Sequence, residues 1–243
     1  MKLLSKVIAA AGIVAATLGS AQATPILGTA NFSLGQVAVS FGEVDWNAPL
    51  NPGQDVVQTY GNFVTPGFAN TGSFATLPFT GLTAGQVMDL SANPADANYF
   101  PVGVPSNIAN FLKLSAQPNW LFTAQLLAPG SFADTPYILT EQNVGNGVTN
   151  VSATLSVSGI VCDAGVDGVC DAGDDISKFT SIYSAQYTNA TIAGLQAILV
   201  GGGTLANNTW SGTLEATRIP EPTSIALFGL ALFGLGLARR RKA

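Results

Sequence analysis

The residues best suited to chemistry lie in a tandem eight-residue repeat that runs from Val161 to Ile176. The first copy reads Val-Cys-Asp-Ala-Gly-Val-Asp-Gly, and the second reads Val-Cys-Asp-Ala-Gly-Asp-Asp-Ile. The two cysteines of the chain, Cys162 and Cys170, occupy the same place in each copy. This spacing is not the Cys-x-x-Cys of a redox pair, and in an oxidising compartment it predicts a structural disulfide.

The same repeat is crowded with acidic residues, and the nearest cation is Lys178. Because like charges at this density repel one another, a hard dication with oxygen ligands would relieve the repulsion, so calcium is one hypothesis. A solvated acidic loop at a sheet edge is the other, since the Asp-x-Asp-x-Asp-Gly start and the terminal Glu of an EF-hand are missing. The candidate calcium ligands are Asp163, Asp167, Asp171, Asp174 and Asp175.

The remaining polar residues offer little for catalysis. The chain has no histidine, which excludes His-based acid/base chemistry, His-containing triads and His-ligated zinc or iron. Glu43 and Asp45 lie two apart near a predicted strand end, where edge protection is commoner than a catalytic pair. We therefore expect no enzyme and no catalytic residues. Trp46, Trp120 and Trp210 could line a sugar-binding face, although most aromatic residues at this density belong to a core.

The C-terminal stretch 219–243 has the composition of a membrane helix with a basic end. An uncharged apolar run, Ile225–Ala238, is followed at once by the basic tail Arg239–Lys242. A transmembrane helix over about 223–238 would be about 24 Å long, against roughly 30 Å for a bilayer core, so it is short for a permanent span. The cations stay on the cytoplasmic side, which places the preceding chain across the membrane.

Pro220 and Pro222 hold Glu221 in an extended tripeptide of the kind that a processing protease needs. Pro-Glu-Pro, a glycine-rich apolar helix and an arginine cluster, in this order, resemble the PEP-CTERM sorting signal of bacterial exported proteins. The resemblance implies cleavage by a membrane exosortase and transient anchoring in the inner membrane, with a final place at the cell surface or outside the cell. An ordinary tail anchor is the alternative. The sorting residues are then Pro220, Glu221, Pro222, Arg239, Arg240 and Arg241.

Residues 1–23 have the three parts of a secretory signal peptide. Lys2 and Lys6 form a positive leader, Val7–Leu18 is apolar, and Ala21 and Ala23 form a small-x-small cleavage site. We predict that signal peptidase cuts after Ala23. An uncleaved N-terminal anchor is the alternative, and the shortness of the apolar stretch disfavours it.

The body between the two targeting segments, residues 24–218, is one strongly acidic domain. It holds three cations, Lys113, Lys178 and Arg218, against thirteen acids, for a formal charge of about −10, compared with −5 for the whole chain. Nucleic acid and anionic lipid are therefore poor partners for this surface.

Alternating apolar and polar residues predict that the body is built from strands. The clearest strands are Val151–Val161, preceded by a hairpin turn at Asn146–Gly147, and Thr209–Arg218. One helix is predicted at Thr191–Val200, with Thr191 as its cap and glycines 201–203 at its end. The other predicted strands are 32–41 with a bulge near Gly35, 56–60, 74–79, 111–114, 120–127 and 179–187.

Antiparallel strands in this number pack as a sandwich or close as a barrel. We predict an all-β antiparallel sandwich, jelly-roll-like or immunoglobulin-like, with one short helix. The order of elements over about 150–218 also resembles the C-terminal half of PEP-CTERM proteins, which implies a β-rich fold without catalytic residues.

Three classes of function fit these observations. The leading one is a structural or interaction protein of the cell surface or extracellular matrix. The alternative is a carbohydrate-binding module, calcium-stabilised through the acidic repeat, for which exopolysaccharide would be the partner. A hydrolase with carboxylate chemistry is the third, and the sequence offers only unpaired candidates for it.

Overall fold

The computed structural model of the chain describes residues 24–46, 60–65, 69–77, 84–132, 135–145, 148–165, 167–171 and 174–219. The predicted signal peptide, the predicted transmembrane helix and most of the strand predicted at 56–60 lie outside these ranges. Within them, no helix is long and apolar enough to cross a membrane.

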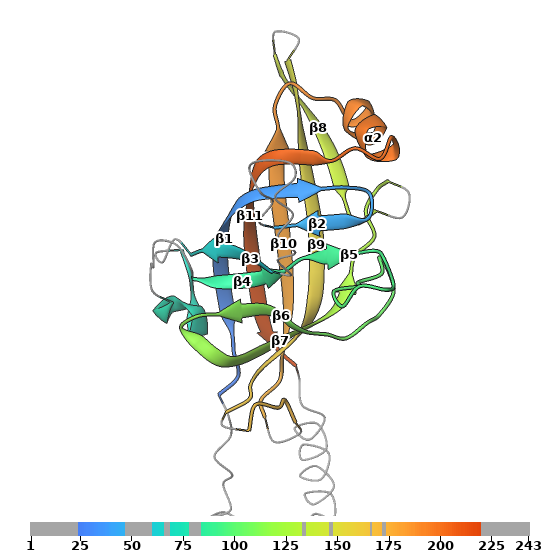
Figure 1. Cartoon of the computed structure of the whole chain (residues 1–243). Helices are drawn as coiled ribbons and strands as arrows, with labels where there is room; N and C mark the ends of the chain where they lie inside the picture. Colours follow the sequence, from blue (N-terminus) through green and yellow to red (C-terminus); the bar gives the residue numbers. More distant parts are fainter. Residues whose placement is uncertain are drawn as a thin grey trace, which may run out of the picture.

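The described body is mostly β, as predicted, with one short α-helix and one 3-10 helix (Figure 1). The strands range from two residues in β5 to 16 residues in β9. The elements are β1 (Gly28–Val39), β2 (Glu43–Asp45), β3 (Tyr60–Val64), η1 (Gly72–Thr76), β4 (Gly85–Met88), β5 (Leu90–Ser91), β6 (Ile108–Leu114), β7 (Gln117–Leu127), β8 (Ile138–Gly145), β9 (Val148–Asp163), β10 (Ser177–Tyr187), α2 (Ile192–Val200) and β11 (Leu205–Arg218).

The strands form one antiparallel sheet that closes on itself. The order around the wall is β11-β10-β9-β7-β6-β4-β3-β1, and β11 pairs back with β1 from Gly28↔Ala216 to Val39↔Leu205. Eight strands therefore make a closed barrel. Three strands extend it: β2 pairs with the end of β1 and with β5, and β8 pairs with the first half of β9.

The predicted two-sheet sandwich is not what the pairing shows, because the first and last strands of the body are hydrogen-bonded to each other. The alternation of apolar and polar residues is the same in a sandwich and a barrel, so it does not reveal which strands pair. The strand predicted at 74–79 is also wrong, since Gly72–Thr76 forms a 3-10 helix. Phe74 is fully buried there and packs edge-on against Trp120, with ring centroids 5.4 Å apart.

Local signals in the sequence correspond to real features. The register of β1 shifts between Leu34 and Gln36, which confirms the bulge predicted near Gly35. The Thr191 hydroxyl accepts a hydrogen bond from the Gly194 N–H and caps α2, and the helix ends at Val200, just before the glycines. β8 and β9 pair as a hairpin across residues 146–147.

The barrel interior is filled by large aromatic side chains that fit against small residues. Trp46 packs against Tyr183 and Trp210, with centroid distances of 4.7 and 5.9 Å. Gly159 and Gly212 face inward, and a Cβ atom at Gly159 would lie 2.0 Å from the Thr123 carbonyl oxygen. Small residues are needed where two strands and an aromatic ring meet, as is usual in narrow barrels.

We expect Gly159→Ala to destabilise the fold by about 3 kcal/mol or more, because the new methyl group collides with backbone as well as with Phe179. The matched control is Gly35→Ala, where a Cβ meets nothing within 4 Å and the lower entropy of the unfolded chain predicts no loss. Urea unfolding of the purified variants checks this, and equal midpoints for both variants would contradict it.

Candidate functional site

The acidic repeat lies at the end of the barrel where the body leads into its C-terminal tail. Ser177, the first residue of β10, pairs with Val161 on one side and with Arg218, the last residue of β11, on the other. Figure 1 shows the loop between β9 and β10 beside the start of β1 and the end of β11. The repeat therefore borders the point where the chain continues toward Pro220, which lies outside the described residues together with the other predicted sorting residues and the cleavage site at Ala21 and Ala23.

The predicted disulfide is present. Cys162, at the end of β9, is fully buried and bonded to Cys170, with a Cα–Cα distance of 5.9 Å. The enclosed loop is also held by backbone hydrogen bonds, from the Ala164 N–H to the Asn119 carbonyl at 3.0 Å and from the Gly168 N–H to the Ala164 carbonyl at 3.1 Å. The loop is therefore a fixed part of this end of the barrel.

The aspartates of the repeat bond the loop's own backbone. Asp163 accepts the Gly165 N–H at 3.2 Å, Asp167 accepts the Val169 N–H at 3.2 Å, and Asp174 accepts the Asp171 N–H at 2.9 Å. Among the described residues, no group of three or more acidic or other metal-binding side chains comes together in an arrangement that could hold a metal ion. The geometry thus gives calcium binding no support, and the hypothesis stays a prediction.

A third carboxylate, Asp89, lies near the pair formed by Glu43 and Asp45. Asp89 is only 3% exposed, and its Oδ1 accepts the backbone N–H of Trp46 at 3.0 Å. Burial raises its pKa to about 7, although the Trp46 hydrogen bond opposes the rise and Asp45 and Glu43 add to it. Sequence spacing could not identify this residue, because Asp89 lies near Glu43 and Asp45 only once β2 pairs with β5.

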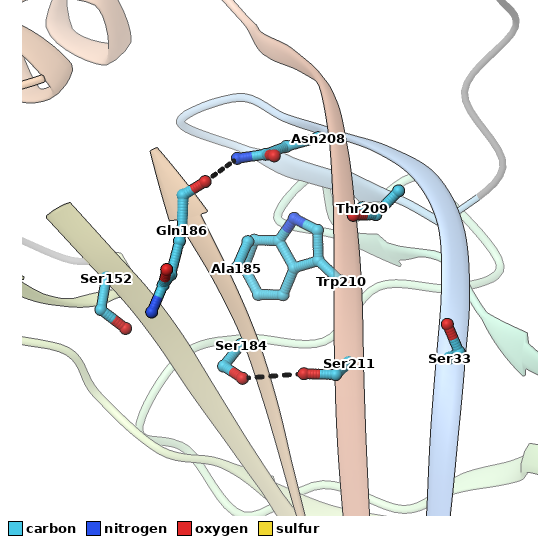
Figure 2. A pocket seen from close by; sticks show the side chains of 9 residues that line it. All are labelled: Ser33, Ser152, Ser184, Ala185, Gln186, Asn208, Thr209, Trp210 and Ser211. Carbon is cyan, nitrogen blue, oxygen red and sulfur yellow. Dashed lines mark hydrogen bonds between the residues drawn. The ribbon is translucent and has the colours of Figure 1, made fainter. Parts of the chain in front are cut away.

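A polar notch of about 370 Å³ opens on the barrel wall between β10 and β11 (Figure 2). At its lower end Ser184 and Ser211 are hydrogen-bonded at 3.2 Å, and at its upper end the Asn208 side-chain amide donates to the Gln186 carbonyl at 2.7 Å. The Trp210 indole lies between the two strands. The lining residues are Ser33, Ser152, Ser184, Ala185, Gln186, Asn208, Thr209, Trp210 and Ser211.

Trp210, one of the candidates for a sugar-binding face, lines the notch, which the sequence does not predict. All three tryptophans are buried, and Trp120, the most exposed of them, is 9% exposed. The alternation of residues in the sequence predicts which face of each strand carries hydroxyl groups. It does not predict the gap between β10 and β11, because that gap depends on where the pairing of the two strands stops.

Taken together, these features define an acidic, disulfide-bonded β-barrel body whose last strand runs directly into a tail with its own signal. Comparison with protein families identifies that tail: residues 218–242 match the PEP-CTERM protein-sorting motif. The chain is therefore a PEP-CTERM sorting-domain protein, which is an exported protein sorted by an exosortase and transiently anchored in the membrane. Neither curated proteins nor solved structures gave a significant match to the chain.

We expect loss of the disulfide in Cys162→Ser/Cys170→Ser to lower the free energy of unfolding by about 2–3 kcal/mol, because the short loop then gains freedom in the unfolded chain. Urea unfolding of the purified double variant measures this. The wild type under reducing conditions should match the variant, and an unchanged midpoint in both would show that the bond contributes nothing to stability.

We expect Asp89→Asn to remove a pH dependence of stability. A carboxyl whose pKa rises from 3.8 in the unfolded chain to about 7 in the folded one leaves the protein most stable below pH 3.8, and stability falls as the pH rises through 7. At pH 8 the variant should be more stable by at most about 4 kcal/mol, and at pH 4 it should match the wild type.

Thermal unfolding between pH 4 and pH 8 checks this expectation. Glu215→Gln, which removes the same charge from an exposed position on β11, is the matched control for the loss of a charge alone. A parallel profile for Asp89→Asn and the wild type would contradict the assignment.

Proposed function

We propose that the exported body is a non-enzymatic structural or interaction protein of the cell surface or extracellular matrix. The observation that carries the proposal is that the tail leaves one end of the barrel while α2, which exposes Ile198 and Val200, lies at the other. β11 runs from the α2 end to Arg218 over 14 residues, which is roughly 45 Å of strand. During anchoring by the tail, the α2 end therefore points away from the membrane.

The end that carries α2 has the character of a contact surface (Figure 1). α2 is apolar on nearly all sides, although only Leu195 and Leu199 are buried. The Glu141 carboxylate accepts the Ile192 N–H at 3.1 Å and ties the helix to β8. Exposed apolar groups of this kind favour association with another surface. Those at this end are Val148, Ile198 and Val200.

The barrel interior supports a passive body. Trp46, Trp210, Tyr183 and Phe179 are among the largest fully buried side chains, and they occupy the space in which many barrels bind a ligand. The outer face of β9, β10 and β11 carries mainly hydroxyl groups. Such a surface suits a protein that works by contact in an aqueous matrix.

A carbohydrate-binding module remains the second candidate, and the notch beside Trp210 is the observation that favours it. Recognition by stacking on an exposed aromatic platform has less support, since all three tryptophans are buried. Stabilisation by calcium through the acidic repeat belongs to this candidate as an untested hypothesis.

We expect replacement of Pro220, Glu221 and Pro222 by alanine to hold the protein in the inner membrane, because the extended recognition tripeptide is lost. The wild type should be found at the cell surface or in the medium at a lower mass than the precursor. Cell fractionation with mass spectrometry of the purified protein measures both.

The matched control is Thr223→Ala/Ser224→Ala, which changes the next two residues and keeps the tripeptide. It should be processed like the wild type. Equal mass and location for the triple variant and the wild type would contradict sorting through this tripeptide, and a wild type that stays in the inner membrane would contradict a surface role.

A further inference from the structure

The notch between β10 and β11 exists because the two strands separate. Their pairing ends at Ser184↔Ser211. Beyond this point β10 stays with β9 as far as Tyr187↔Val151, while β11 stays with β1, beginning with Trp210↔Leu34. The hydrogen bond from Asn208 to Gln186 spans the gap at its upper end. The barrel wall is therefore continuous from Ser177↔Arg218 to Ser184↔Ser211 and open beyond that last pair.

From the chemistry of this opening, we propose that the notch binds an uncharged segment of a glycan through hydrogen bonds to its hydroxyl groups. The proposal deepens the carbohydrate-binding candidate by naming its site and ligand class. It does not depend on where the protein is finally delivered, so its test is separate from the sorting experiment.

A polar group without a hydrogen-bond partner among the described residues, the Trp210 indole N–H, belongs to a residue that lines the notch. The Trp210 side chain is 1% exposed and lines the notch, and its Nε1 donor has no hydrogen-bond partner in the part of the chain that the structure describes. The buried hydroxyl of Tyr187 on β10 is equally without a partner. Leaving such a donor unpaired is unfavourable, and a ligand oxygen would give it a partner.

Tyr187 lies close to Trp210 and Asn208, two residues that line the notch. Burial raises the pKa of its phenol to about 12, although the Trp210 and Asn208 side chains lie close enough to oppose the rise. The Tyr187 hydroxyl and the Trp210 indole N–H are near one another and still able to take another partner.

The lining determines the class of ligand. Its nine residues carry hydroxyl, amide, indole and methyl groups and no ionisable side chain. A metal ion would find no carboxylate here, and an anion would be repelled by a body of formal charge about −10. The volume of about 370 Å³ is at the lower end of the roughly 300–1,000 Å³ of small-ligand sites. A neutral ring bearing several hydroxyl groups fits both conditions.

The surface beyond the notch favours a chain over a single sugar. Thr154, Ser184, Ser211 and Ser33 stand opposite one another on four adjacent strands and form a row of hydroxyl groups across the outer wall. A glycan seated in the notch can therefore extend over more hydroxyl groups.

The experiment titrates the purified full-length protein with glucose, mannose, galactose and N-acetylglucosamine, each as the monosaccharide and as a linear tetrasaccharide. A tetrasaccharide of galacturonic acid is the anionic comparison. Calorimetry measures binding, and tryptophan fluorescence reports on Trp210. We expect at least one neutral tetrasaccharide to bind, and to bind more tightly than its monosaccharide and than the anionic probe.

Two variants locate the binding. Ser211→Leu places an apolar side chain in the notch from an exposed position, and it should weaken binding about tenfold or more, which corresponds to 1.4 kcal/mol. Trp210→Phe removes the unpaired donor and should also weaken binding. The matched control is Thr213→Leu, two residues further along the outer face of the same strand, and it should bind within about twofold of the wild type.

Each result decides the proposal. Binding of a neutral tetrasaccharide that Ser211→Leu weakens and Thr213→Leu preserves supports it. Absence of binding by every neutral probe overturns it, as does tighter binding of the anionic tetrasaccharide. Equal affinity for wild type and Ser211→Leu also overturns it. Circular dichroism confirms that each variant is folded, and because Ser211 is exposed, the test does not depend on whether Trp210→Phe folds.

Discussion

The pairing of β1 with β11 is the interaction on which the rest of the structure depends. It joins the beginning of the body to its end over the register from Gly28↔Ala216 to Val39↔Leu205, and bringing such distant segments together costs chain entropy that local contacts do not recover. In return, the two strands that would otherwise be sheet edges are both covered. The closure also brings the start of the body, the acidic repeat and the exit to the sorting motif to one end.

A closed wall imposes different chemistry on its two faces. The inner face must be filled, so Trp46, Tyr183 and Trp210 pack together while Gly159 and Gly212 leave room for backbone and rings. The outer face of β9 to β11 remains hydrated and carries mainly hydroxyl groups. Where β10 and β11 separate, a side chain of the inner face lines an opening on the outer face. An interior side chain, Trp210, then forms the base of a polar notch on the outside.

Local sequence patterns predict the structure correctly where interactions between neighbouring residues determine it. The strand at 151–161, the cap at Thr191, the bulge near Gly35 and the bond between Cys162 and Cys170 all follow from short-range alternation, side-chain hydrogen bonding or loop length. The errors concern long-range pairing. Residues 74–79 have the apolar content of a strand, but Phe74 is buried against Trp120 from a helical turn. The sequence does not reveal Asp89, which the pairing of β2 with β5 brings near Glu43 and Asp45, nor the notch, which depends on where the pairing of β10 with β11 stops.

By itself, the sequence determined that this chain is β-rich, disulfide-bonded and addressed for export, since these properties depend on composition, short spacings and a linear motif that is read as an extended peptide. The tertiary structure alone decided that the sheet closes as a barrel, that the acidic side chains of the repeat bond their own loop, and that a notch opens beside Trp210. The physical reason is that alternation specifies which face of a strand is buried, whereas the choice of neighbouring strand depends on how all the side chains fit together inside.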